Sequence, residues 1–214
     1  MYSRGGTFVV LKNYLFTAFI AVICVIGISV DSRREANMIE YGIRSLEERD
    51  LQMVLQWRNS ERVHSKMLTD HKIAWEEHVA WFQRIKDNPI KRNLIFEFLG
   101  RPIGYIGYTE YDEKKGCCSP GAYLGETDVP IDAGITLFYM AVEYAFTKLK
   151  MERLETSVFK SNKIAMKIDK FLGYKEIPES DEVFIKNGKE EVAVRMFMTR
   201  DDWDEHKQGM IVSI

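Results

Sequence analysis

The sequence predicts an α/β (α+β) domain in which helices flank both faces of a mixed, mostly antiparallel central sheet. Three observations predict this fold. Short segments rich in β-branched and aromatic residues, with tight turns between them, follow one another from residue 93 to residue 124. Segments with apolar residues at helical spacing lie before and after this run. Strands and helices in this order are expected to pack in layers around one core.

The first predicted elements are a strand at residues 39–46 and a helix at residues 47–58. Acidic residues occupy the first turn of this helix, where the helix dipole favours them. After a polar loop, a second helix is predicted from four apolar residues at helical spacing: Trp75, Val79, Phe82 and Ile85. We expect this helix to end at Asn88, because Pro89 disfavours helical backbone in the residue before it.

The middle of the chain predicts an antiparallel meander of three strands. The strands are expected at residues 93–99, 103–111 and 117–124. Residues 100–102 form a tight link between the first two, and residues 112–116 form the turn before the third.

A long helix is predicted at residues 134–149, where apolar residues nearly encircle the axis. Only Thr136, Glu143 and Thr147 form a narrow polar stripe, so we expect this helix to be buried against the sheet.

The last part of the chain predicts strand, helix and hairpin. Residues 154–159 read as a strand, and residues 164–172 form a helix that Gly173 ends. Two closing strands, at residues 183–186 and 192–198, flank Asn187-Gly188, a pair that favours the turn of a two-residue hairpin.

Composition excludes several classes of function. The chain has 214 residues and 46% hydrophobic content, which is enough for the core of one domain. The formal net charge is -2 with dispersed basic residues, so we expect no nucleic-acid partner. Cys24 lies in an apolar run and Cys117 and Cys118 are adjacent, a spacing that suits neither disulfides nor zinc. We therefore expect a reduced protein without a metal site.

The segment Asn162–Tyr174 carries the most specific chemistry. Asn162 follows a predicted strand and precedes a short helix, where its amide offers a donor and an acceptor to an amide-bearing ligand such as pantetheine. The same Asn fits an ordinary helix start. These two interpretations stay open on spacing alone.

The pattern of Asn162, Ala165 and Gly173-Tyr174 resembles the acetyl-CoA-binding signature of the GNAT superfamily of N-acetyltransferases. Further segments in the same order resemble one branch of it, the enzymes of pseudaminic acid biosynthesis that acetylate a UDP-linked amino-dideoxy sugar. These segments are Trp57–Asn59, Thr69–His71, His78–Phe82, Pro102–Gly107, Lys186–Gly188 and Met196–Trp203. The resemblance covers residues 39 to 203 and implies a GNAT-like fold, acetyl-CoA as acyl donor and a cytoplasmic enzyme.

The resemblance also implies where the acyl donor binds, with its pyrophosphate on backbone N–H groups at the start of the long helix. The implied cofactor-binding residues are Tyr123, Leu124, Gly125, Ala133, Gly134, Ile135, Thr136, Asn162 and Ala165. The family's glycine-rich loop is altered, since Val129 replaces a basic or amide residue and Asp132 replaces a glycine. A carboxylate aimed at a pyrophosphate would repel it, so we expect Asp132 to turn away and cap the helix.

Acetyl transfer needs a neutral amine and a route for its proton. The superfamily's usual acid, a tyrosine, would fall on Asp169, and a carboxyl donates poorly to a thiolate unless its pKa is raised. The candidate base is Glu110, expected on the strand face of Tyr108, with Glu97 as second carboxylate and Ser119 to hold a water.

Acceptor-binding candidates are basic and aromatic: Arg58, His71, His78, Trp81 and Tyr108. Arginine and imidazole donors suit a diphosphate, and a uracil stacks on an aromatic ring. His78 also falls on the apolar stripe of its helix, so a core histidine bonded to backbone is an equal interpretation.

The predicted function is transfer of acetyl from acetyl-CoA to the amine of a UDP-linked amino-dideoxy sugar by direct attack. Two alternatives stay open: an acetyltransferase of protein α-amines like those that modify ribosomal proteins, and a silent GNAT-like binding module, suggested by Val129, Asp132 and Asp169. The partners are then a small amine and no nucleic acid, with a dimer as one possible assembly.

Residues 1–37 form an apolar N-terminal extension ahead of a domain at residues 38–214. Residues 14–30 carry no charge and approach the length of a bilayer-spanning helix. A membrane anchor is one interpretation. A misassigned start is the other, because Met38 directly precedes the part of the chain that resembles the family. A cleaved signal peptide is disfavoured, since no small-residue cleavage site follows.

Overall fold

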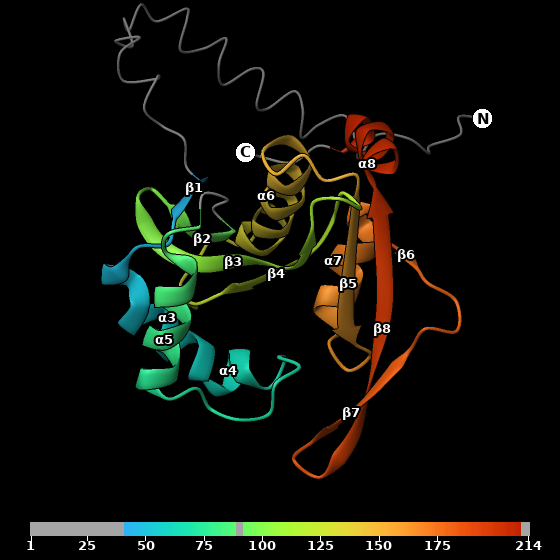
Figure 1. Ribbon diagram of the computed structural model, residues 1–214. Coiled ribbons are helices and arrows are strands. Elements are labelled where there is room, and N and C mark those ends of the chain that lie inside the picture. The colour runs from blue at the N-terminus through green and yellow to red at the C-terminus, as the bar shows by residue number, and fades with distance from the viewer. Residues whose placement is uncertain (1–40, 89–91, 211–214) are drawn as a thin grey trace, which may run out of the picture. The chain divides into compact units, whose positions relative to one another are not determined.

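The computed structural model describes residues 41–88 and 92–210 (Figure 1). It contains an eight-stranded sheet in the order β1-β2-β3-β4-β5-β8-β6, with β7 paired to β8. The strands are β1 Tyr41–Ser45, β2 Asn93–Phe98, β3 Arg101–Asp112, β4 Cys117–Leu124, β5 Arg153–Phe159, β6 Lys175–Glu176, β7 Glu182–Lys186 and β8 Lys189–Thr199. The predicted fold class is confirmed.

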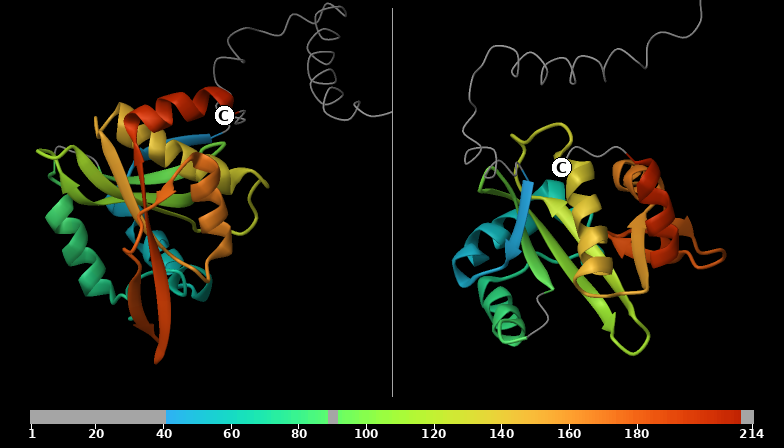
Figure 2. Two further views of the ribbon diagram at one scale, coloured as in Figure 1. Left: turned by 90° about the vertical axis from the view of Figure 1, so that its right-hand side faces the viewer. Right: turned by 90° about the horizontal axis from the view of Figure 1, so that it is seen from above.

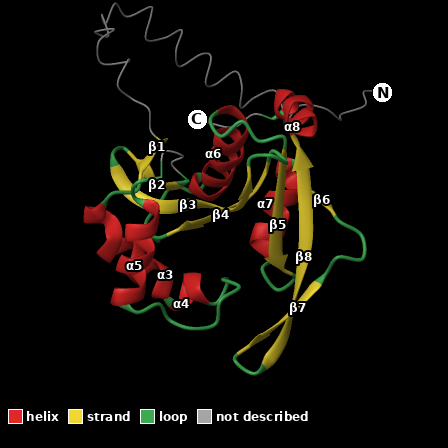
Figure 3. Cartoon of the chain, in the orientation of Figure 1, coloured by secondary structure: helices red, strands yellow, loops and turns green. Residues whose placement is uncertain are grey.

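Helices cover both faces of this sheet (Figures 2 and 3). They are α3 Leu51–Asn59, α4 Glu61–His64, α5 Trp75–Ile85, α6 Ala133–Thr147, α7 Lys163–Leu172 and α8 Arg200–His206, with 3-10 turns η1 Glu48–Asp50 and η2 Lys207–Gly209. The larger core joins α6, α7 and α8 to one face, and the smaller core joins α3 to the other through Val54, Trp57 and Ile95. Alternation along β2 supplies both cores, since Leu94 and Phe96 face α6 while Ile95 faces α3.

The sheet opens between β4 and β5. Every strand pair is antiparallel except this one, which is parallel and held only by Cys117 opposite Arg153 and Cys118 opposite Leu154. Beyond these positions the two strands diverge, as Figure 1 shows, and α6 forms the crossover that a parallel pair requires. The backbone of residues 119–124 therefore has a sheet edge that β5 does not pair.

Several helices bury other residues than the sequence predicted. Trp75 is 46% exposed, and on α7 the apolar residues Ile164 and Phe171 are 75% and 52% exposed. The inward side of α7 carries Asp169 and Leu172 instead. Thr136, expected on the polar stripe of α6, is fully buried. Apolar periodicity located these helices but did not fix which face the sheet covers.

Four short elements were not predicted. They are α4, α8, β6 and η2. The start of α8 has a readable signal, because Thr199 and Asp202 form a reciprocal capping box and Trp203 is fully buried. In contrast, Asn187 and Gly188 adopt the positive φ angles expected of the β7–β8 hairpin turn.

Within residues 41–88 and 92–210, no helix is both long and apolar enough to cross a membrane. In the same ranges, no group of three or more His, Cys, Asp or Glu side chains is arranged to hold a metal ion. The apolar segment at residues 14–30 lies outside the described residues.

Candidate active site

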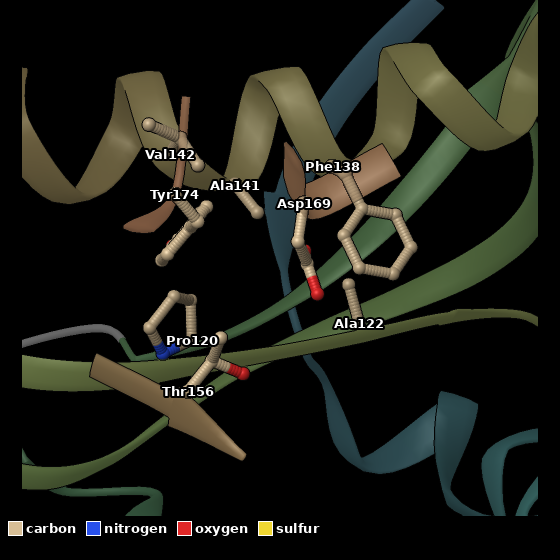
Figure 4. A pocket seen from close by; sticks show the side chains of 8 residues that line it. All are labelled: Pro120, Ala122, Phe138, Ala141, Val142, Thr156, Asp169 and Tyr174. Carbon is tan, nitrogen blue, oxygen red and sulfur yellow. The ribbon is translucent and has the colours of Figure 1, made fainter. Parts of the chain in front are cut away.

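The opening between β4 and β5 contains a small cavity of about 20 Å³ (Figure 4). Its walls come from β4, β5, α6 and the C-terminal half of α7. The lining residues are Pro120, Ala122, Phe138, Ala141, Val142, Thr156, Asp169 and Tyr174. The lining is mostly apolar and contains one carboxyl group, that of Asp169.

Asp169 points from α7 toward this cavity, between Tyr174 and Phe138 (Figure 4). It is only 4% exposed, and burial raises the pKa of its carboxyl group to about 7. No hydrogen bond to this carboxyl occurs among the described residues. Sequence reasoning rejected Asp169 as an acid, because the pKa of an aspartate depends on burial that the sequence does not display.

The start of α6 lies at the wide end of the opening. Two N–H groups of its first turn are occupied, since Ala133 donates to Pro130 and Thr136 donates to the backbone carbonyl of Asp132. The N–H groups of Gly134 and Ile135 lie between them, where a helix offers no acceptor of its own. The hydroxyl of Thr136 is buried without a hydrogen-bond partner among the described residues. This turn can therefore hold an anion.

Asp132 does not cap α6 as expected. Its side chain makes no capping hydrogen bond, and it accepts one from the hydroxyl of Tyr41 at 2.7 Å. The partner of this carboxylate is therefore Tyr41 on β1 and not the first turn of α6.

The end of β4 is fixed by Trp57. A Cβ atom on Gly125 would lie 2.0 Å from the indole ring, so only glycine fits there. The indole N–H donates to Glu126 at 2.8 Å, and Arg62 donates to the carbonyl of Gly125 at 2.6 Å. Trp57 and Arg62 thus hold the start of the loop that leads to α6.

Side chains along β4 alternate across the sheet. Leu124 faces the larger core, whereas Tyr123 faces α3 and stacks on Tyr105 with ring centroids 5.3 Å apart. Only the backbone of Tyr123 is therefore available to a ligand in the opening.

Asn162 starts α7, as one of the two interpretations predicted. Its Oδ1 accepts from the N–H of Ala165 at 3.4 Å, and Gly173 ends the helix at a φ of 98°. The carbonyl oxygen of the amide is thus engaged by the helix. Its NH₂ group donates to none of the described residues, which leaves a donor at the wide end of the opening.

Arg58 lies on α3, on the sheet face that carries the smaller core, and one of its guanidinium nitrogens is buried without a partner in the described part of the chain. Its Nη2 donates to the hydroxyl of Thr69, whereas Nη1 is buried without a partner among the described residues. Burial lowers the pKa of this guanidinium, and Tyr105, Tyr123 and Glu77 are its electrostatic neighbours. An unpaired buried donor of this kind suits an anionic ligand.

The two histidine candidates differ. His71 is exposed, and its Nε2 lies 3.2 Å from the carboxylate of Glu77. His78 is 5% exposed and stacks on Trp81, and its Nε2 is buried without a hydrogen-bond partner among the described residues. This burial favours the second interpretation, a core histidine, and lowers the pKa of His78. Trp81 is half-buried beside it.

The structure contradicts one of two expectations for β3. The hydroxyl of Tyr108 donates to the carbonyl of Ala141, so Tyr108 faces α6 and not α3, and its contact with the acceptor stays a prediction. Glu110 does not share the face of Tyr108, because it has a φ of 50° in a β-bulge and is exposed.

The other catalytic candidates are separated as well. Glu97 is held by Arg44 at 2.7 Å on the β1 side of the sheet. Ser119 directly follows the last β4–β5 pair, at the narrow end of the opening.

Lys186 joins two segments that sequence reasoning noticed but did not connect. Lys186 is 5% exposed, and its ammonium group donates to the carbonyls of His64 at 3.1 Å and Met67 at 2.5 Å. The N–H of Asn187 donates to Asp70. The β7–β8 hairpin therefore holds the loop that carries Thr69 and His71 beside Arg58.

A mixed sheet that opens between two parallel strands, with a helix start at the wide end, can hold an extended ligand whose anionic group lies at that helix start. The family model described as the acetyltransferase (GNAT) domain matches residues 43–191, and the chain belongs to this family. It is an acetyltransferase with acetyl-CoA as acyl donor.

Two curated relatives are acetyltransferase PseH of two Campylobacter jejuni strains. One is 26% identical over 123 residues, which cover 58% of this chain and 75% of the relative. The other is 27% identical over 125 residues, with the same coverage of 58% and 75%. The predicted resemblance to this branch is confirmed.

Solved structures share the fold. Spermidine N-acetyltransferase from Vibrio cholerae, in complex with CoA and spermine, has a TM-score of 0.71 at 19% identity over 77% of this chain and 98% of that one. The yncA protein from Salmonella typhimurium, with its cofactor acetyl-CoA, has a TM-score of 0.62 at 16% identity over 78% of this chain and 96% of that one.

Proposed function

We propose that the protein transfers the acetyl group of acetyl-CoA to the primary amine of a UDP-linked amino-dideoxy sugar. The observation that carries this proposal is Arg58, with a partly buried guanidinium and an unpaired Nη1 on the α3 face. The similarity to acetyltransferase PseH supports the same class of acceptor.

The charge of Arg58 separates this acceptor from a polyamine. A nucleotide sugar brings a diphosphate that arginine binds with charge-assisted hydrogen bonds. A polyamine brings several positive charges, which a partly buried cation repels. Arg58 therefore favours the nucleotide sugar, although the fold is shared with a spermidine N-acetyltransferase.

In this proposal the two substrates approach from opposite directions. The diphosphate of acetyl-CoA lies on the first turn of α6, near Gly134, Ile135 and Thr136. Its pantetheine arm lies along the unpaired edge of residues 119–124 as an added strand would, and Asn162 donates to an amide of it. The acceptor lies beside Arg58, with the exposed His71 and half-buried Trp81 near its nucleotide.

The reaction is a direct attack. The neutral amine adds to the thioester carbonyl, whose oxygen is stabilised by backbone N–H groups of β4. Collapse expels the thiolate of CoA. Neither Ser119 nor the exposed Glu110 lines the cavity, so in this proposal either of them takes up the amine proton only through water.

Two further proposals concern the whole chain. We propose that residues 38–214 form the acting domain in the cytoplasm, where acetyl-CoA is present, and that residues 1–37 take no part in the chemistry. A chain beginning at Met38 should bind acetyl-CoA as tightly as the full chain. Loss of binding would show that the extension belongs to the domain.

Thermal-shift measurements with UDP, spermidine and acetyl-CoA test the acceptor class. We expect UDP and acetyl-CoA to stabilise the protein and spermidine to leave it unchanged. Arg58→Ala should remove the shift by UDP and keep the shift by acetyl-CoA, whereas the control Arg84→Ala, an exposed arginine on α5, should keep both. Stabilisation by spermidine but not by UDP would replace the proposed acceptor with a polyamine. Response to neither would favour the protein α-amine acceptor.

A further inference from the structure

Asp169 is a buried carboxyl group that the proposed binding of the two substrates leaves without a role. It lines the cavity at the narrow part of the β4–β5 opening. Ala141, on the opposite wall, lies about 12 Å along α6 from Ala133 at the usual helical rise. An extended pantetheine arm spans such a distance, so a donor whose diphosphate rests at the start of α6 brings its thioester to this cavity.

Tyr174, which lines the cavity beside Asp169, and the titratable groups around Tyr174 and Tyr108 hold their protons at neutral pH. Burial raises the pKa of the Tyr174 and Tyr108 hydroxyls well above the ordinary value, and it also raises that of Tyr144 on α6. Burial raises the pKa of the Cys118 thiol on β4 to about 12. The carboxyl of Asp169 is therefore the group beside the cavity that exchanges its proton near neutrality.

We propose that protonated Asp169 donates its proton to the sulfur of the departing CoA. As the tetrahedral adduct collapses, the C–S bond breaks and its electron pair moves to sulfur, which takes the proton from the carboxyl oxygen. The products are the amide, the CoA thiol and the Asp169 carboxylate. The carboxylate regains a proton from solvent, which has received the proton lost by the amine.

The energetics suit this transfer. A thiol has a pKa of roughly 8.5, so a buried carboxyl of near-neutral pKa passes its proton to the thiolate downhill. An ionised Asp169 in the same apolar cavity would instead repel the developing thiolate. Asp169 thus acts as an acid below its pKa, and above its pKa it has no proton to donate. This role rests on the acetyl-CoA reaction and not on the identity of the acceptor.

Asp169→Asn tests the proposal, since it keeps the size of the side chain and removes the acidic proton. The donors are acetyl-CoA and its selenoester analogue, whose selenolate leaves without a proton. We expect the variant to lose about 100-fold in kcat with acetyl-CoA. With the selenoester it should lose much less. A merely structural role would lower both rates equally.

The pH profile gives the second readout. With acetyl-CoA, the part of the wild-type kcat that depends on protonated Asp169 should disappear as the pH rises through about 7. This loss forms an alkaline limb in the pH profile of kcat, and Asp169→Asn should lack it. Hydrolysis of the two donors without any amine gives the same comparison, so failure of the proposed acceptor does not affect it. Equal losses with both donors, or an alkaline limb that persists in the variant, would overturn the proposal.

Discussion

The hydroxyl of Tyr41 donates a hydrogen bond to the carboxylate of Asp132 at 2.7 Å, across 91 positions of sequence. The bond joins β1 to the residue that precedes α6. It engages the carboxylate with Tyr41, so that the carboxylate makes no capping bond to the helix start that we propose for the donor's diphosphate. The altered glycine-rich loop of this chain is thereby compatible with binding of acetyl-CoA.

Removing this bond should weaken donor binding. In Tyr41→Phe the Asp132 carboxylate is released next to the diphosphate, and we expect the Kd of acetyl-CoA to rise about tenfold, which corresponds to roughly 1.5 kcal/mol, the lower end for a hydrogen bond to a charged group. Asp132→Gly should keep or improve the affinity, because it removes the charge. Titration calorimetry measures both. A marked loss in Asp132→Gly would mean that the carboxylate itself supports the site.

Gly125→Ala should disturb the same loop from its other end. The new methyl would overlap the indole of Trp57, and such overpacking costs typically 1–3 kcal/mol. Chemical denaturation measures the loss, and the Kd of acetyl-CoA should rise with it. Gly42→Ala on β1 is the control, since nothing lies within 4 Å of its Cβ. Equal stability of the two variants would contradict the packing described for Trp57.

Two variants of Asn162 separate its two roles. Asn162→Ala removes the cap of α7 and the free NH₂ donor, so it should cost about 1 kcal/mol of stability and weaken acetyl-CoA by roughly 1–2 kcal/mol. Asn162→Asp keeps a capping oxygen and should lose affinity but little stability. If Asn162→Asp binds acetyl-CoA as the wild type does, Asn162 serves only the helix.

Asp169 makes the folded protein pH-sensitive. Its pKa is about 7 when folded, compared with roughly 3.9 in the unfolded chain, so the folded state binds the proton more tightly. This contribution is complete at low pH and is lost as the pH rises from about 4 through about 7. We expect Asp169→Asn to be the more stable protein at pH 8, with an advantage that shrinks toward pH 4. Denaturation curves at both pH values measure it, and an advantage independent of pH would refute the raised pKa.

Local patterns in the sequence predicted most of the fold. The meander strands, the hairpin at Asn187-Gly188 and the end of α7 at Gly173 depend on neighbouring residues, which the sequence displays. Which side of α7 is buried was not predictable in this way, because it depends on the elements that pack beside the helix. These elements bury Asp169 and leave Phe171 exposed.

The site was predicted less well for the same reason. The partner of Asp132 lies on a strand far away in the sequence, and the bulge that turns Glu110 to solvent has no strong signal in β3. The contact of Lys186 with the loop before His71 joins two segments that were noticed separately. Tertiary packing decides each of these cases.

Initial rates of acetyl transfer from acetyl-CoA, compared between a UDP-linked amino-dideoxy sugar, spermidine and an N-terminal peptide amine, test the central claim most directly. We expect the nucleotide sugar to be acetylated with a kcat/KM at least about 100-fold above the other two, the effect of a few charge-assisted hydrogen bonds to its diphosphate. Arg58→Ala should lower that value mainly through a higher KM for the sugar. A higher kcat/KM for spermidine or the peptide, unchanged in Arg58→Ala, would contradict the proposed function.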